Sequence, residues 1–264
     1  MSTAVNPLHL KELEFFKANV IKNPDRLRRQ WLGATALDRR KLTPYGRQLL
    51  ATLGRTPTLL GPLGRTHAEV LHTKVMVWAM NHDELGDAAT KAFLQLLEDA
   101  DVHGVAKRPK MGKPDAINVQ GERSLPGFGR ADLWLEGKGV VAVEVKVGAE
   151  ETGGDQVERY VAGCTKQVTT KDWVVLFLTL EDEVTPSGPC LHVTLKQLLG
   201  AWLPVAAAGT TGAHDYLARY LSTLAELTDI GGSGAYDDWT VADRRSALDL
   251  VLAIPGAQVE GVEA

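Results

Sequence analysis

The sequence has few cysteines and no long apolar segment, and both features narrow the class of protein. Cys164 and Cys190 are its only two cysteines, and they form no CxxC motif and no paired spacing. We therefore expect two reduced thiols in a cytoplasmic protein rather than a disulfide or a zinc site. No apolar run approaches the roughly 18–20 residues of a membrane helix. The N-terminus lacks a basic start followed by an apolar block, so we expect neither a secretory signal nor a membrane partner.

Charge is distributed unevenly along the chain. The 264 residues have a formal net charge of -4, yet residues 1–65 contain twelve Lys and Arg against four Asp and Glu. Beyond Leu227 the sequence leans acidic. A basic arm on an acidic body can contact phosphates, although a solvated helix face explains the same charges. We expect a basic helical N-terminal segment at 1–65 and an acidic C-terminal extension at 229–264.

The pattern of apolar residues predicts helices around a central group of strands. Helices are expected at 8–50 (two or three, broken near Pro44), 66–102 (two, with a turn around 81–86), 154–168 and 214–227. Strands are expected at 117–125, 131–137, 140–147 and 173–180, with a short strand leading into a helix over 192–203. A Gly/Pro-rich stretch at 56–66 has the composition of a linker, and the last 36 or so residues are weakly patterned. This mixture predicts an α/β fold.

Two charged residues lie inside an apolar strand, VVAVEVKV, at 140–147. Residues two apart in a strand point to the same face, so Glu144 and Lys146 share one face and the flanking valines share the other. A lone buried charge costs several kcal/mol, and an ion pair in an apolar strand is often no better than two apolar residues. A bound metal ion would offset that cost.

The preceding strand supplies a second carboxylate. A hairpin through Gly137–Gly139 pairs residues 131–136 with 140–146, which places Asp132 beside Glu144. Two carboxylates and a backbone carbonyl, such as that of Val145, are the hard oxygen ligands that Mg²⁺ prefers. Lys146 can then orient or deprotonate a water molecule, or stabilise a pentavalent phosphorus. These groups are suited to phosphodiester hydrolysis.

The stretch GRADLWLEGKGVVAVEVKV resembles the core of the PD-(D/E)XK nuclease superfamily, whose signature is an Asp, a spacer and then Glu-x-Lys. Here these are Asp132 and Glu144-Val145-Lys146. Gln156 and Tyr160 form a Q-x-x-x-Y motif, as in the branch that includes recombination exonucleases, and the earlier helix has an E-x-x-H motif that starts at Glu69. The resemblance covers about residues 66–228.

The resemblance implies a restriction-endonuclease-like core, a central mixed sheet flanked by helices, at 66–228. It implies that Asp132, Glu144 and Glu69 hold Mg²⁺ or Mn²⁺, with Lys146 as the catalytic cation. It also implies that Gln156 holds the water shell of the metal or a phosphate, while Tyr160 braces the lysine or the backbone. DNA is the expected substrate, with RNA left open. Many enzymes of this fold act as dimers, and the terminal segments are the candidates for a homodimer contact.

Each candidate residue also has a structural explanation. Glu144 and Lys146 could form an ion pair at a sheet edge, and Asp132 could close a turn. Gln156 and Tyr160 could be ordinary helix residues, and Glu69 could simply begin a helix, where acids are common. Glu122, in the first predicted strand, is a weaker candidate for a further carboxylate.

Three functional hypotheses follow. The first is a metal-dependent DNA nuclease that acts in defence against foreign DNA or in DNA repair. The second is a catalytically silent nucleic-acid-binding or regulatory protein that keeps the nuclease fold. The third is an interaction protein in which residues 1–65 bind a protein partner. The intact set of Asp132, Glu144 and Lys146 favours the first, because a silenced site usually loses one member.

Overall fold

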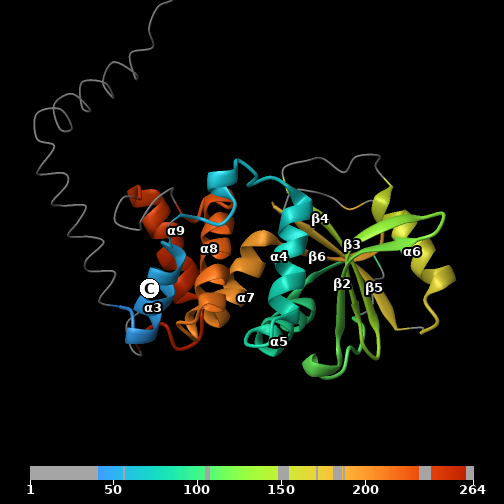
Figure 1. Cartoon of the computed structure of the whole chain (residues 1–264), viewed down its shortest axis with the longest axis horizontal. Coiled ribbons are helices and arrows are strands. Elements are labelled where there is room, and N and C mark those ends of the chain that lie inside the picture. The colour runs from blue at the N-terminus through green and yellow to red at the C-terminus, as the bar shows by residue number, and fades with distance from the viewer. Residues whose placement is uncertain are drawn as a thin grey trace, which may run out of the picture.

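The computed structural model describes residues 41–259 with gaps at 56, 105–107, 148–154, 171, 181–185, 187 and 232–238. Residues 1–40, which hold most of the predicted basic helical segment, lie outside the described residues, as do the last five of the predicted acidic extension. Within the described ranges, a mixed six-stranded sheet is flanked by helices (Figure 1). The predicted α/β fold with a central mixed sheet is confirmed.

The sheet joins an antiparallel half to a parallel half. Its strands are β1 (Asp101–His103), β2 (Asn118–Leu125), β3 (Gly129–Glu136), β4 (Val140–Lys146), β5 (Trp173–Thr179) and β6 (Cys190–Thr194). Their spatial order is β1-β6-β5-β4-β3-β2. β2, β3 and β4 form an antiparallel meander, β4, β5 and β6 run parallel, and β1 is antiparallel to β6. The sequence predicts all of them except β1, whose three residues are too few to show an alternation.

Helices cover both faces of the sheet and bury β4 completely. They are α3 (Pro44–Leu53), α4 (Glu69–Asn81), α5 (Gly86–Asp99), α6 (Gln156–Gln167), α7 (Leu195–Ala207), α8 (Gly212–Leu227) and α9 (Val241–Leu252). α6 packs on one face, and α4, α5 and α7 contact the other (Figure 1). Val141, Val143 and Val145 join the larger core, whereas Val140 and Ala142 join the core beneath α6. By alternation, Glu144 and Lys146 belong to the α6 face.

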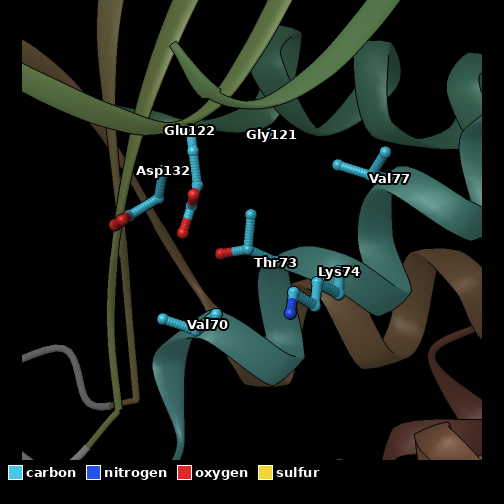
Figure 2. A pocket seen from close by; sticks show the side chains of 7 residues that line it. All are labelled: Val70, Thr73, Lys74, Val77, Gly121, Glu122 and Asp132. Carbon is cyan, nitrogen blue, oxygen red and sulfur yellow. The ribbon is translucent and has the colours of Figure 1, made fainter. Parts of the chain in front are cut away.

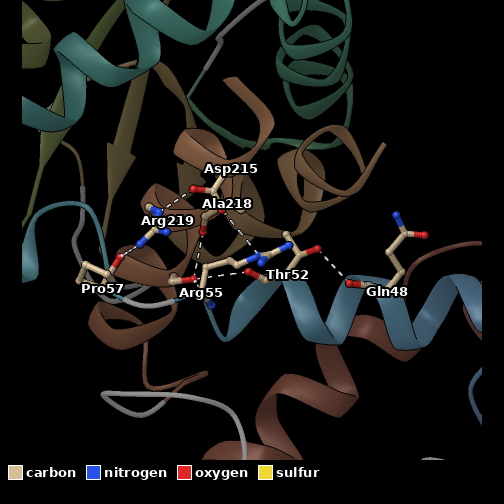
Figure 3. A network of polar contacts seen from close by, with 8 residues as sticks. Gln48, Thr52, Arg55, Pro57, Asp215, Ala218 and Arg219 are labelled. Atoms are coloured by element: carbon tan, nitrogen blue, oxygen red, sulfur yellow. Dashed lines mark hydrogen bonds and ion pairs between the residues drawn. The ribbon is translucent and has the colours of Figure 1, made fainter. Parts of the chain in front are cut away.

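A further helical layer lies beside α7, in which α3 and α8 contact α7 and α9 contacts α3. Figure 3 shows how polar contacts fasten the chain after α3 to α8. Arg219 of α8 bonds the Asp215 carboxylate (Nε–Oδ2, 2.7 Å) and the Pro57 carbonyl (2.9 Å), and the Leu59 N–H donates to the Arg219 carbonyl (3.0 Å). The Gly/Pro-rich stretch predicted as a linker is therefore held against α8. None of the helices in the described ranges is both long and apolar enough to cross a bilayer.

α9 is the one described helix that lies in a region the sequence leaves weakly patterned. Its apolar residues do not form a clear stripe, which is why periodicity does not reveal it. Its N-terminus is a reciprocal cap, in which the Thr240 side chain accepts the Asp243 N–H and the Asp243 carboxylate accepts the Thr240 N–H. A Thr followed three residues later by an acid was the available signal.

The register of the β3–β4 hairpin follows the prediction. Leu133 pairs with Val143 and Glu136 pairs with Val140, so the same register continued by one residue brings Asp132 opposite Glu144. The connecting turn is closed by the Gly137 N–H, which donates to the Gly139 carbonyl (2.9 Å). This short turn therefore sets which two carboxylates meet.

Tight packing around the turn generates a stability prediction. A Cβ at Gly137 would overlap the Met111 carbonyl oxygen and the Ile117 side chain. Gly137→Ala should therefore lower the free energy of unfolding by about 1–3 kcal/mol, measured by urea denaturation. The matched control is Gly212→Ala, where nothing lies within 4 Å of the added Cβ. Equal unfolding free energies for the two variants would contradict this account of the turn.

Candidate functional site

The fold gathers the predicted site residues at the end of β4 that follows Val143. Asp132 comes from β3, Glu144 and Lys146 from β4, Glu69 from the first turn of α4, and Gln156 and Tyr160 from the first two turns of α6. Five of the six are joined by direct interactions around Glu144 and Lys146. Gln156 is half-buried one helical turn before Tyr160.

Asp132 lies where β3 separates from β4. The backbone pairing ends at Leu133 and Val143, and the Asp132 Oδ2 then accepts the Val145 N–H (2.9 Å), in place of a strand carbonyl. Side-chain alternation also breaks here, because Ala131 joins the core beneath α6 while Leu133 joins the opposite core. These features turn the Asp132 carboxylate along the sheet toward β4.

The backbone across from Asp132 is strained. Glu122 of β2 has a φ of 54°, in the left-handed region that non-glycine residues seldom occupy. Its carboxylate lies 3.4 Å from the guanidinium of Arg130. Strained backbone is common beside functional sites, where the surrounding structure stabilises it.

Glu144 and Lys146 form a buried ion pair. Their side chains are 2% and 7% exposed, and the Lys146 Nζ lies 2.8 Å from the Glu144 Oε1. The same ammonium lies 3.6 Å from the Glu69 Oε2, and the Glu69 Oε1 accepts the Val147 N–H (3.2 Å). Glu69 therefore connects the start of α4 both to the lysine and to the backbone at the end of β4.

Tyr160 holds the other oxygen of Glu144. Its hydroxyl oxygen lies 2.7 Å from the Glu144 Oε2 and 2.5 Å from the Arg130 carbonyl oxygen, so one proton serves two acceptors. Burial, and then the charge of Glu144, raise the pKa of Tyr160, which keeps the hydroxyl protonated. The tyrosine thus contacts the backbone, as expected, but it braces Glu144 rather than Lys146.

Electrostatics leave this cluster negative. Burial and then the nearby Glu144 carboxylate raise the pKa of Asp132 to about 7. Burial alone would lower the pKa of Lys146, but the hydrogen bond and charge of Glu144, together with Glu69 and Asp132, raise it. Lys146 therefore stays protonated at neutral pH. Three carboxylates and one ammonium have a net charge of minus two when all are ionised, a deficit that a divalent cation would neutralise.

Two of the three predicted ligands, Asp132 and Glu144, are suitably placed for a hard divalent cation, and the third contacts other groups. Asp132 and Glu144 lie side by side, and carboxylate oxygens suit Mg²⁺, which keeps several of its waters. Among the residues that the structure describes, no group of three His, Cys, Asp or Glu side chains is arranged to hold a metal ion. Glu69 uses its oxygens on Lys146 and on the Val147 N–H. Its role as a third metal ligand stays a prediction.

His72, the fourth residue of the E-x-x-H motif, contacts the chain just before α4 and thereby helps to position Glu69. Its ring is fully buried, with Nε2 2.6 Å from the Thr66 carbonyl and Nδ1 3.1 Å from the Tyr220 hydroxyl of α8. A carbonyl can only accept, so Nε2 carries the proton and Nδ1 accepts from the tyrosine. Burial lowers the pKa of His72, which favours this neutral form. His72 thereby fixes the chain that leads into α4 and Glu69.

A pocket of about 250 Å³ opens beside Asp132, between α4 and β2 (Figure 2). Its lining consists of Val70, Thr73, Lys74, Val77, Gly121, Glu122 and Asp132. The sequence alone does not identify these α4 residues or Gly121 as part of a site. Their spacing along α4, three and four residues apart after Glu69, was the signal available in the sequence.

The raised pKa of Asp132 generates a prediction about stability and metal binding. A native carboxyl with a pKa of about 7, against 3.8 when unperturbed, loses stability as pH rises through that window. In EDTA, Asp132→Asn should match wild type near pH 4 and exceed it at pH 8, by up to about 4 kcal/mol in unfolding free energy. Asn keeps an oxygen for the Val145 N–H.

Mg²⁺ supplies the control for that measurement. At pH 8, Mg²⁺ should raise the melting temperature of wild type and leave that of Asp132→Asn nearly unchanged, because the variant lacks one of the two carboxylates. A wild type that is more stable than Asp132→Asn at pH 8 in EDTA would show that burial and the nearby Glu144 carboxylate do not raise the pKa of Asp132.

Comparison with known proteins agrees with this geometry. A family model described as the PD-(D/E)XK nuclease superfamily matches residues 59–190, half of the chain. The match runs from the segment before α4 to the first residue of β6, and thus contains all six predicted site residues. No curated protein and no solved structure matches the chain. The E-x-x-H and Q-x-x-x-Y motifs stay a prediction. The resemblance to the superfamily is confirmed, and the chain belongs to the PD-(D/E)XK nuclease superfamily.

Proposed function

We propose that this protein is a metal-dependent deoxyribonuclease, which uses Mg²⁺ or Mn²⁺ to hydrolyse DNA phosphodiester bonds in defence against foreign DNA or in DNA repair. The observation that supports this most directly is the contact between Asp132, Glu144 and Lys146. Two neighbouring carboxylates and a protonated lysine are costly to bury together at a strand end, because each loses its hydration and the two carboxylates repel each other. Metal-dependent phosphodiester hydrolysis can use all three groups, the carboxylates to hold the ion and the lysine to stabilise developing negative charge.

Asp132 and Glu144 would hold the metal ion, together with the Val145 carbonyl. When bound, the ion supplies a Lewis acid for a phosphoryl oxygen and lowers the pKa of a bound water. Asp132 also accepts the Val145 N–H, so its carboxylate is oriented before any ligand arrives. Tyr160 fixes the rotamer of Glu144 from the opposite side. Both carboxylates are therefore held in advance, which reduces the reorganisation needed for catalysis.

Lys146 would act as a cation and hydrogen-bond donor rather than as a base. Its raised pKa keeps the ammonium charged, so it can orient the attacking water and stabilise charge that develops on the phosphoryl oxygens. Glu69 lies on the far side of this ammonium and limits its movement. Gln156 remains a candidate contact for a phosphate. The basic segment 1–65 would add phosphate contacts whose strength falls with salt.

Cleavage assays test the proposal. Purified protein should degrade plasmid, linear or single-stranded DNA in Mg²⁺ or Mn²⁺, and EDTA should abolish the activity. Lys146→Ala and Glu144→Gln should each lower kcat/KM by at least about 100-fold, because each removes a charge from the reacting centre. Gln preserves the shape of Glu144 and its bond to Tyr160, so this variant separates loss of charge from loss of folding.

Lys91→Ala, on the exposed surface of α5, is the matched lysine control and should retain activity. RNA is included as a substrate, and its exclusive cleavage would redirect the proposal to a ribonuclease. A wild type that binds DNA in a salt-sensitive way but cuts no nucleic acid with either metal would refute catalysis and favour the silent nucleic-acid-binding protein.

A further inference from the structure

The pocket beside Asp132 has one wall made by a single face of α4. Val70, Thr73, Lys74 and Val77 are spaced three and four residues apart, so their side chains line one stripe of the helix. The facing wall is formed by Gly121 and Glu122 of β2 and by Asp132 of β3 (Figure 2). The pocket therefore shares Asp132 with the proposed reacting centre, and a group that enters the pocket lies beside this carboxylate.

The lining matches the parts of one nucleotide. Val70 and Val77 give α4 an apolar surface against which a flat ring can pack, with the small side chain of Thr73 between them. The bare backbone of Gly121 closes the pocket where β2 lies closest to Val77. Lys74 supplies an ammonium group on the exposed face of α4, where a phosphate could reach it. The Glu122 carboxylate is close to Arg130, which partly offsets its repulsion of an anion.

The size of the pocket limits its occupant. Clefts that enclose drug-sized ligands measure about 300–1,000 Å³, and this pocket measures about 250 Å³. It can admit a single base with its sugar but not a segment of duplex. A base that enters it must leave its stack, which costs least in single-stranded DNA or at a frayed end.

We propose that this pocket is a nucleotide subsite, which receives one unstacked base adjacent to the scissile phosphate while Lys74 contacts the neighbouring phosphate. The inference rests on the proposed function and deepens it, because it assigns single-stranded DNA or frayed ends as the preferred substrate. Gly121 is the specificity-determining position, since the absence of a side chain there keeps the pocket open.

Gly121→Ala isolates the pocket from the fold. The φ of Gly121 lies outside the left-handed region, and an added Cβ would lie 3.5 Å from the Val77 Cγ2, 3.8 Å from the Asp132 carbonyl oxygen and 3.9 Å from the Thr73 Cγ2. These are ordinary contact distances, so the folded protein accommodates the methyl group, which narrows the pocket between β2 and α4. Gly212→Ala, whose Cβ meets nothing within 4 Å, is the matched control.

The test measures kcat/KM on a fluorescein-labelled single-stranded DNA oligomer and on its duplex. A series of single-stranded oligomers then places one abasic residue at each successive position around the cleavage site. Wild type should prefer the single strand and lose about tenfold in kcat/KM when one particular position next to the cut is abasic. Gly121→Ala should lose about tenfold on the intact strand and show little further loss at that position, because both changes remove the same contact.

Lys74→Ala tests the phosphate contact separately. It should weaken cleavage uniformly across sequences and lower the slope of log kcat/KM against log salt by about one, whereas Lys91→Ala should leave the slope unchanged. Unaltered salt dependence in Lys74→Ala would overturn the assignment of Lys74.

The outcomes separate this inference from the proposed function. If wild type cuts DNA but Gly121→Ala keeps the wild-type kcat/KM and abasic profile, the subsite is overturned and the nuclease stands. If wild type cuts nothing, the nuclease proposal fails, and fluorescence anisotropy with the same oligomer decides the subsite. Weaker binding by Gly121→Ala than by Gly212→Ala would then support it, and equal affinities, or no binding at all, would overturn it.

Discussion

The ion pair between Lys146 and Glu144 is the interaction on which the rest of the site depends. Both side chains are almost fully buried in the central strand, so each would be costly without the other. Neighbouring elements contribute to keeping the pair intact. α4 brings Glu69 to the ammonium, α6 brings Tyr160 to the second oxygen of Glu144, and β3 brings Asp132 alongside. The position of β4 between two helical layers buries both members of the pair.

The pair does not balance the charges around it. Asp132 adds a carboxylate beside Glu144, and the resulting repulsion and burial raise its pKa to about 7. A protein selected for stability alone would place an apolar residue there. Local breaks in regular structure also indicate that this region is not optimised for stability. The strand pairing stops at Leu133, and Glu122 takes a left-handed backbone conformation across from Asp132. Charge repulsion and backbone strain occur together at this point, as is typical of functional sites.

Much of the fold and the central part of the site could be predicted from the sequence, since both depend on short-range patterns. The Gly137–Gly139 turn and the alternation of β4 determine which residues of β3 and β4 face one another, and this places Asp132 near Glu144. Contacts between distant segments could not be predicted in this way. Nothing local indicates that Tyr160 reaches Glu144 instead of Lys146, or that Glu69 caps the Val147 N–H 78 residues away. β1 and α9 were missed because one is too short and the other lacks an apolar stripe.

The helical layer takes part in building the site. Tyr220 of α8 donates to His72, whose other nitrogen holds the Thr66 carbonyl just before α4 begins. The position of Glu69 at the start of α4, and through it that of the Lys146 ammonium, is therefore linked to α8, whose Tyr220 lies 148 residues beyond His72. That helix lies beyond the 59–190 segment matched by the superfamily model. Asp132, Glu144 and Lys146 lie within the shared core, but the orientation of the lysine depends on packing that this chain supplies outside it.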